Sequence, residues 1–79
     1  SERKIKLIWD FKGPDAQRIA EHHAKHLEEY VALERLELKT VGHLQLSEVH
    51  SYAFLVVPEN QMIKMRDALK PHRAEIFIA

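Results

Sequence analysis

RKIKLIWDFK, residues 3–12, alternates between apolar and polar side chains with a period of two, which is typical of a β-strand with one strongly apolar face. Its apolar positions are Ile5, Leu7, Trp9 and Phe11. KGPDA, residues 12–16, then breaks the pattern, because Gly13 suits a turn and Pro14 suits the first position of a helix, where no amide donor is needed. A strand followed directly by a helix is therefore the starting unit of the fold.

The next segment predicts a long helix from about Pro14 to about Leu33, because apolar residues recur there every three or four positions. The predicted inner stripe consists of Ala16, Ile19, Ala20, His23, Leu27, Tyr30 and Val31. A period of two returns after Glu34 and predicts a second strand, with a bulge or bend at Gly42. The apolar positions of this strand are Leu36, Leu38, Leu44 and Leu46.

The second half of the chain repeats the strand and helix signals. A polar hairpin connection, residues 47–51, leads to YAFLVV, residues 52–57, which is apolar on both faces as a central strand would be. PEN, residues 58–60, opens a second helix that Pro71 ends, and AEIFIA, residues 74–79, is the last strand. The inner positions of that helix are Met62, Met65 and Leu69.

The order β-α-β-β-α-β predicts an α+β protein with a ferredoxin-like fold, as one domain over residues 1–79. Right-handed crossovers place the first and third predicted strands at the centre of a four-stranded antiparallel sheet, with two helices on one face. One helical layer cannot cover a strand that is apolar on both faces, so we expect a homodimer through the uncovered sheet faces. Edge-to-edge pairing of two sheets is the alternative geometry.

Composition excludes several classes of protein. The charges balance at 12 basic and 12 acidic residues, which argues against a nucleic-acid partner. With no cysteine there is no disulfide, no thiolate zinc site and no cysteine nucleophile, and this composition suits the cytoplasm. No apolar run approaches the roughly 20 residues of a membrane helix, and no signal peptide is recognisable. We therefore expect a cytoplasmic protein with no membrane partner.

The predicted topology brings four polar residues together at the end of the sheet where the first strand finishes: Asp10, His50, His72 and Arg73. Arginine holds a carboxylate or phosphate through two hydrogen bonds, and the helix start at Gly13 offers further amide donors. We expect this end to bind a small anionic or aromatic molecule. Under the alternative, Arg73 pairs with Asp10 or Glu48 and both histidines are solvated.

AEHHAKHLEEY, residues 20–30, makes the first helix rich in histidine. His22 and His26 are four apart on the border of the apolar stripe, a spacing that can chelate zinc or another transition metal. Asp15, Glu29 or a group from another chain would have to complete such a site. His23 points inward by its helical phase, either as a core-lining imidazole bonded to backbone or water or as a ring facing a cavity.

No nucleophile elbow and no glycine-rich phosphate loop is present, and no cofactor is expected apart from a metal at the paired histidines. Three classes of function remain open. The first is a binding module for a small molecule, and the second is a small enzyme without a cofactor that uses histidine as acid or base. The third is a metal-binding protein.

Four blocks of the sequence resemble a group of short bacterial proteins with a ferredoxin-like, dimeric α+β barrel fold. They are KLIWDFKGPDA (6–16), AEHHAKHLEE (20–29), HSYAFLVV (50–57) and ALKPHRAEIF (68–77). The resemblance implies a dimer in which two sheets face each other with the helices outside. It implies no catalytic residue, because no defined motif of the superfamily matches here, and a fold alone does not license an activity.

Overall fold

The computed structural model describes residues 3–34 and 40–77. Its elements are β1 (Lys4–Lys12), α1 (Ala16–Leu33), β2 (Val41–Ser47), β3 (His50–Pro58), α2 (Glu59–Leu69) and β4 (Arg73–Phe77). The predicted positions Leu36 and Leu38 of the second strand, and the last two residues of the chain, lie outside the described residues.

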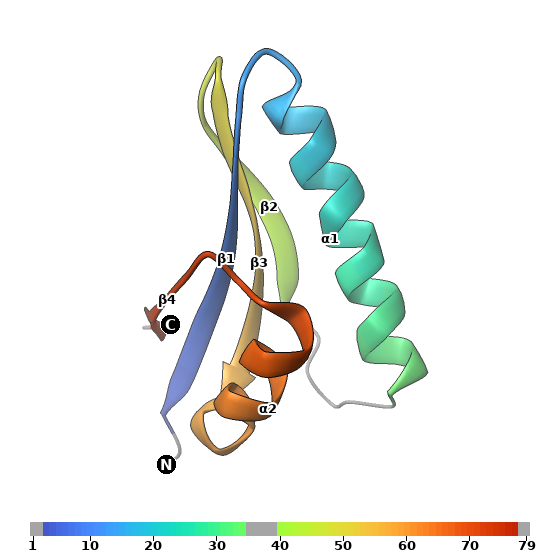
Figure 1. Cartoon of the computed structure of the whole chain (residues 1–79), viewed down its shortest axis with the longest axis vertical. Helices are drawn as coiled ribbons and strands as arrows, with labels where there is room; N and C mark the ends of the chain where they lie inside the picture. The colour runs from blue at the N-terminus through green and yellow to red at the C-terminus, as the bar shows by residue number, and fades with distance from the viewer. Residues whose placement is uncertain (1–2, 35–39, 78–79) are drawn as a thin grey trace.

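The four strands form one antiparallel sheet in the order β2-β3-β1-β4. The first and third strands are central, and both helices pack on the same face, with α1 along the length of the sheet and α2 near its lower part (Figure 1). The predicted ferredoxin-like fold is confirmed. No helix within residues 3–34 and 40–77 is long and apolar enough to cross a membrane.

The core lies between the sheet and the two helices. Alternate residues of β1 and β3 meet the inner stripes of α1 and α2 there. The core residues are Ile5, Leu7, Trp9, Ala24, Leu27, Val31, Ala53, Leu55, Val57 and Met65. The indole Nε1 of Trp9 donates a hydrogen bond to the carbonyl of Leu69 at 3.1 Å, which fastens the end of α2 to β1.

The helix α1 begins two residues later than predicted. Gly13 has φ +111°, a left-handed conformation that favours glycine, and its N–H donates to the carbonyl of Val49 at 2.8 Å. Pro14 therefore belongs to the turn, and the first helical residue is Ala16. The inner stripe also differs, since Ala24 is buried and Ile19 is 44% exposed. Alanine at every fourth position lets the helix approach the sheet closely, and this turns Ile19 outward.

The predicted bulge lies at a different place in β2. The register with β3 is regular through Gly42 and shifts between Gln45 and Ser47, next to the hairpin. Gly42 lies opposite Phe54, and a Cβ at Gly42 would come within 2.7 Å of the ring carbon Cζ of Phe54. A glycine is needed at this position because the ring of Phe54 covers it, and the backbone needs no bend there.

The face of the sheet away from the helices is called the open face below. It carries Lys6, Ile8 and Asp10 from β1, together with their neighbours in register on β3 and β4. Ile8 has no exposed surface although no helix covers it. Its neighbours in register on this face are Phe54 of β3 and Arg73 of β4.

Candidate functional site

Asp10 is the centre of a polar cluster on β1, and the four residues Asp10, His50, His72 and Arg73 are called the Asp10 cluster. Arg73 donates from Nε to Oδ2 of Asp10 at 2.8 Å and from Nη2 to Oδ1 at 3.2 Å. Nε2 of His50 lies 2.9 Å from Oδ1 of the same carboxylate. The backbone N–H of Asp10 donates to Nδ1 of His72 at 2.9 Å. One residue thus connects β1, β3 and the start of β4.

The sheet geometry explains why His72 reaches this position. β4 begins at Arg73, opposite Ile8, so the N–H of Asp10 points towards an edge where the ladder has ended. Pro71 precedes His72 and stops α2 from continuing. The N–H of His72 donates to the carbonyl of Ile8 at 2.9 Å, and its ring nitrogen replaces the missing backbone acceptor for Asp10.

The contacts fix the ionisation of Asp10 and the protonated nitrogen of each ring. The hydrogen bonds from Arg73 lower the pKa of Asp10 to about 2; burial of the carboxyl opposes this shift, and His50 adds to it. The same pairing raises the pKa of Arg73. A carboxylate accepts only, so Nε2 of His50 carries the proton; Nδ1 of His72 accepts, so the proton of its neutral ring lies on Nε2.

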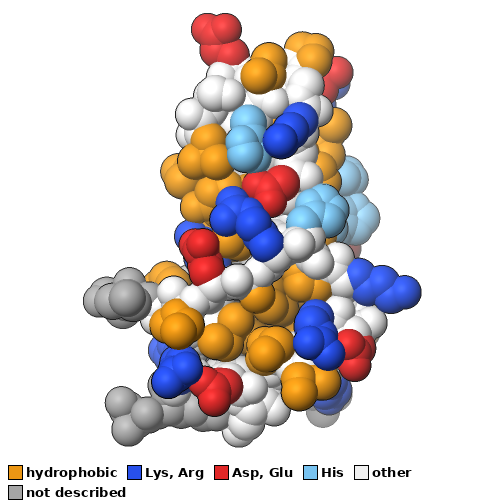
Figure 2. Space-filling model, turned by 60° about the vertical axis from the view of Figure 1, so that its left-hand side comes forward, with side chains coloured by type: hydrophobic (Ala, Val, Ile, Leu, Met, Phe, Trp, Pro, Cys, Tyr) orange, Lys and Arg blue, Asp and Glu red, His pale blue; other side chains and the backbone are white. Residues whose placement is uncertain are grey.

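Three neighbours of the Asp10 cluster were not anticipated. The guanidinium carbon of Arg73 lies 5.7 Å from the ring centroid of Tyr52, and Nη1 of Arg73 lies 3.5 Å from Glu75. Lys6 donates from Nζ to the hydroxyl of Tyr52 at 3.0 Å and lies over the ring of Phe54. Figure 2 shows acidic, basic and histidine side chains side by side in the upper half of the molecule, with hydrophobic side chains gathered below them.

The register between the strands explains why these residues are neighbours. Asp10 lies opposite Tyr52, and Lys6 lies opposite Glu75, so all four side chains share the open face. The sequence shows the alternation of each strand but not which residue of one strand faces which residue of the next.

The predicted chelating pair lies on the exposed side of α1. Nε2 of His22 and Nε2 of His26 are 2.9 Å apart, and one ring donates to the other. The proposed completing ligands Asp15 and Glu29 do not join them, because residues 3–34 and 40–77 hold no group of three or more histidine or carboxylate side chains that suits a metal ion. The structure therefore offers two ligands to a metal from this helix.

His23 points inward, as predicted. Its ring lies 5.1 Å from that of Trp9 and 5.4 Å from that of Phe11, and the ring of Phe11 lies 6.3 Å from that of His72. Its Nε2 is buried and has no hydrogen-bond partner in the described part of the chain, so of the predicted bond to backbone or water the bond to backbone is not made there. Burial, with smaller repulsion from the other histidines, lowers the pKa of His23 below its ordinary value.

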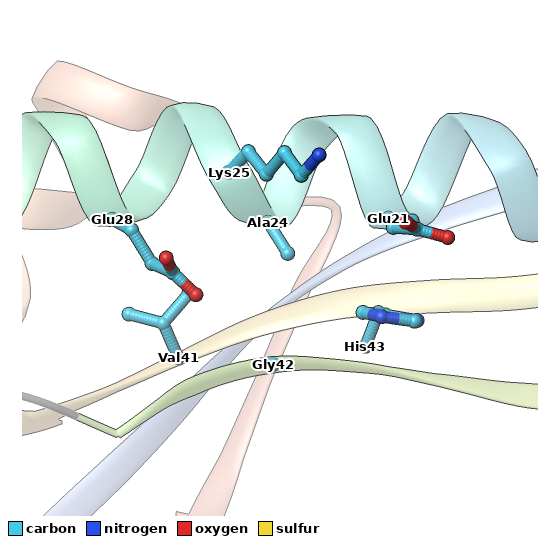
Figure 3. Close-up of a pocket in the computed structure, with 7 residues that line it drawn as sticks. All are labelled: Glu21, Ala24, Lys25, Glu28, Val41, Gly42 and His43. Carbon is cyan, nitrogen blue, oxygen red and sulfur yellow. The ribbon is translucent and has the colours of Figure 1, made fainter.

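A groove of about 430 Å³ lies between α1 and β2, away from the Asp10 cluster. Figure 3 shows Ala24 pointing from α1 towards the strand, Glu28 reaching over Val41, and His43 pointing from β2 towards the helix. The sequence did not predict this groove. Its signal is the small side chain of Ala24, which leaves space between the helix and the strand that a larger residue would fill.

The four residues predicted for ligand binding thus come together, but Arg73 is already paired. Half of the alternative interpretation is confirmed, since Arg73 pairs with Asp10. The histidines are partly solvated, since His72 is exposed and His50 is half-buried, and each also hydrogen-bonds to Asp10. The start of α1 lies at the top of the sheet in Figure 1, above the connection between α2 and β4.

Comparisons of this chain with protein family models, with curated proteins and with solved structures find no match.

Proposed function

We propose that this chain is a small-molecule-binding module whose ligand site is the Asp10 cluster. The observation that supports this proposal is that Asp10 holds two imidazole rings, each through one nitrogen. When the ring of His50 is neutral, its second nitrogen is a hydrogen-bond acceptor, and the second nitrogen of His72 is a donor. A pair of oriented polar groups beside aromatic rings is typical of sites that bind small molecules.

The pairing of Arg73 favours an aromatic ligand over a simple anion. A phosphate or carboxylate that binds the guanidinium through Nε and Nη2 would have to displace Asp10, which loses two charge-assisted hydrogen bonds. An aromatic ring bearing a hydroxyl or carboxyl group can instead pack beside the half-buried Phe11, next to His72, and exchange hydrogen bonds with the histidines. We therefore propose a small aromatic molecule with one hydrogen-bonding substituent.

Backbone amide chemical shifts measured with phenol, benzoate and inorganic phosphate test this proposal. Phenol and benzoate should shift the amides of His50, Tyr52 and His72 in a saturable manner, while phosphate should not. Asp10→Asn should weaken the effect because it releases Arg73 and His50. His22→Ala, a change at a distant exposed histidine, is the matched control and should bind as the parent does. Saturable shifts with phosphate alone, or none with either aromatic probe, would contradict the proposal.

A small enzyme is the second candidate, favoured by the 2.9 Å contact between Asp10 and His50. A carboxylate that holds one imidazole nitrogen orients the ring and leaves the other nitrogen to accept a proton from a substrate. Hydrolysis of p-nitrophenyl acetate measures such reactivity directly. His50→Gln should lower the rate more than His26→Gln does, and equal rates in the two variants would reject this candidate.

The proposed module is a cytoplasmic homodimer of bacterial origin. The resemblance of its four sequence blocks to dimeric α+β barrel proteins supports this proposal. So does the apolar surface on the hairpin between β2 and β3, where Leu44 is 48% exposed and Leu46 is 50% exposed. Light scattering that gives a mass of one chain at tens of micromolar would contradict the homodimer.

A further inference from the structure

The strand β2 forms an edge of the sheet, and residues 41–45, before its bulge, carry neither the charges nor the prolines that protect edges. Its sequence, VGHLQLS, contains no proline and no charged residue. The opposite edge strand, β4, carries Arg73 and Glu75 instead. Exposed edges normally carry lysine, other charges or proline, because unpaired backbone groups otherwise recruit another strand. Of the two edge strands, β2 is therefore the less protected by charge.

The alternation of hydrogen bonds shows which backbone N–H and C=O groups of β2 face away from β3. The N–H of Val56 donates to the carbonyl of Thr40 at 3.0 Å, so the even-numbered residues of this segment turn their amides towards β3. The odd-numbered residues, Val41, His43 and Gln45, turn their N–H and C=O groups away from the sheet. These three alternate residues lie before the bulge, and no strand of the described residues pairs with them on this side.

The side chains of β2 are complementary in size to those of a second β2 strand that runs antiparallel to it. On the open face Leu44 is 48% exposed, while Gly42 presents no side chain and has the ring of Phe54 over it. An antiparallel strand centred on His43 places a large residue opposite a small one in both directions. Such self-complementarity is what a two-fold interface requires.

We propose that a second copy of this chain pairs its β2 antiparallel with β2, with His43 on the two-fold axis. Val41 then lies opposite the partner's Gln45, and Leu44 packs against the partner's Gly42 beside the partner's Phe54. Two four-stranded sheets become one continuous sheet. The pairing satisfies the free backbone groups of β2 and covers Leu44.

The groove between α1 and β2 is also compatible with a second copy of the chain as the partner. Glu21, Glu28 and Lys25 line the groove above β2, so the groove carries both signs of charge. A second copy brings the same two signs, and the chain has no net charge to oppose association. A strongly charged foreign peptide would meet a like charge on one of these side chains.

This geometry rests on the proposed homodimer and selects its interface. Pairing at β2 leaves the open face uncovered, so the Asp10 cluster stays accessible to a ligand. Face-to-face packing would place a second sheet over Lys6, Asp10 and Arg73, whose charged groups lie on that face. Oligomeric state and ligand binding are therefore separable measurements.

Light scattering of two variants tests the edge. His43→Pro removes the outward N–H, whereas the ladder to β3 does not use it, so the fold should persist and the dimer should be lost. His43→Ala keeps the backbone and should remain dimeric, at twice the 9.3 kDa mass of the chain. A monomeric parent would overturn both the homodimer and this geometry. A dimeric His43→Pro with unchanged circular dichroism would overturn the geometry alone.

Disulfide trapping tests the register, because the chain has no cysteine of its own. His43→Cys places one thiol on the axis, directly opposite its symmetry mate, and mild oxidation should give a covalent dimer. Gln45→Cys is the matched control: its symmetry mate lies about four residues away along the strand, beyond the reach of a disulfide. Equal trapping in both variants, or trapping only in Gln45→Cys, would overturn the proposed axis.

Discussion

At the residue scale, Asp10 shows how one side chain organises three elements. Its carboxylate is 19% exposed and accepts hydrogen bonds from Arg73 and His50, while its backbone N–H is satisfied by His72. The ordinary aspartate pKa is 3.8 and the folded value is about 2, so the folded chain binds this proton less readily than the unfolded chain does. The carboxylate therefore adds stability above about pH 4, and this stability is lost as the pH falls through about 2.

Asp10→Asn should lower the free energy of unfolding at pH 7 by roughly 1–2 kcal/mol, an amount reduced by solvent screening of the partly exposed Arg73. The difference between variant and parent should shrink between pH 4 and pH 2. Urea denaturation at several pH values measures both effects. Asp67→Asn is the control, because Asp67 is exposed and its one ion pair within the described residues is with its neighbour Arg66. If the two variants lost equal stability at pH 7, Asp10 would have no special role.

The paired histidines on α1 give a second prediction. His22 and His26 converge at 2.9 Å between their Nε2 atoms, so zinc binding should depend on both and should fade below about pH 6 as the imidazoles protonate. In isothermal titration His22→Ala should lose the heat of zinc binding, while His23→Ala should keep it. His23→Ala should instead lower stability by roughly 1–3 kcal/mol, since its ring packs against Trp9 and Phe11. Equal loss of zinc binding would reject the separation of the two roles.

At the element scale, the pairing of β2 with β3 depends on Gly42. A Cβ there would lie 2.7 Å from Cζ of Phe54, so the ring must rotate away from the strand. Gly42→Ala should therefore destabilise the protein by about 1 kcal/mol. Phe54→Leu removes the atoms in conflict, so the double variant should lose less stability than the two single changes added together. Additive losses in urea denaturation would show that the contact does not limit this position.

At the scale of the whole molecule, His23 links global stability to pH near neutrality. Its pKa is lowered because the ring is buried between α1 and the sheet, and His26, His72 and His22 oppose a further positive charge. The unfolded chain, with an ordinary histidine pKa of 6.5, takes up this proton at a higher pH than the folded chain. Stability is therefore fully present above about pH 6.5 and decreases as the pH falls further.

His23→Phe keeps an aromatic ring at this position without a titratable nitrogen. Its unfolding free energy should change less between pH 7.5 and pH 5 than that of the parent. Chemical denaturation at both pH values measures the difference. His22→Gln controls for the removal of an exposed histidine and should follow the parent. A parallel pH dependence in His23→Phe and the parent would show that His23 does not carry the effect.

The sequence by itself determined the order of the elements and the faces of the strands. A strand such as β1 must bury alternate residues and a helix such as α2 must bury every third or fourth, and both periods are properties of a short segment. The stop at Pro71 is local in the same sense. The order of the elements predicts the topology of the sheet. The sequence therefore also predicted that Asp10, His50, His72 and Arg73 lie at one end of the sheet.

The tertiary structure alone decided how those residues bond and which face of α1 turns inward. Asp10 meets His50 across 40 positions, and it meets His72 and Arg73 across 62 and 63. Those contacts depend on register and on where β4 begins, and no local period records either. Ala24 is buried and Ile19 is exposed because helix and sheet approach each other most closely through small side chains. This effect depends on the contact between the two surfaces, so the helix sequence alone does not show it.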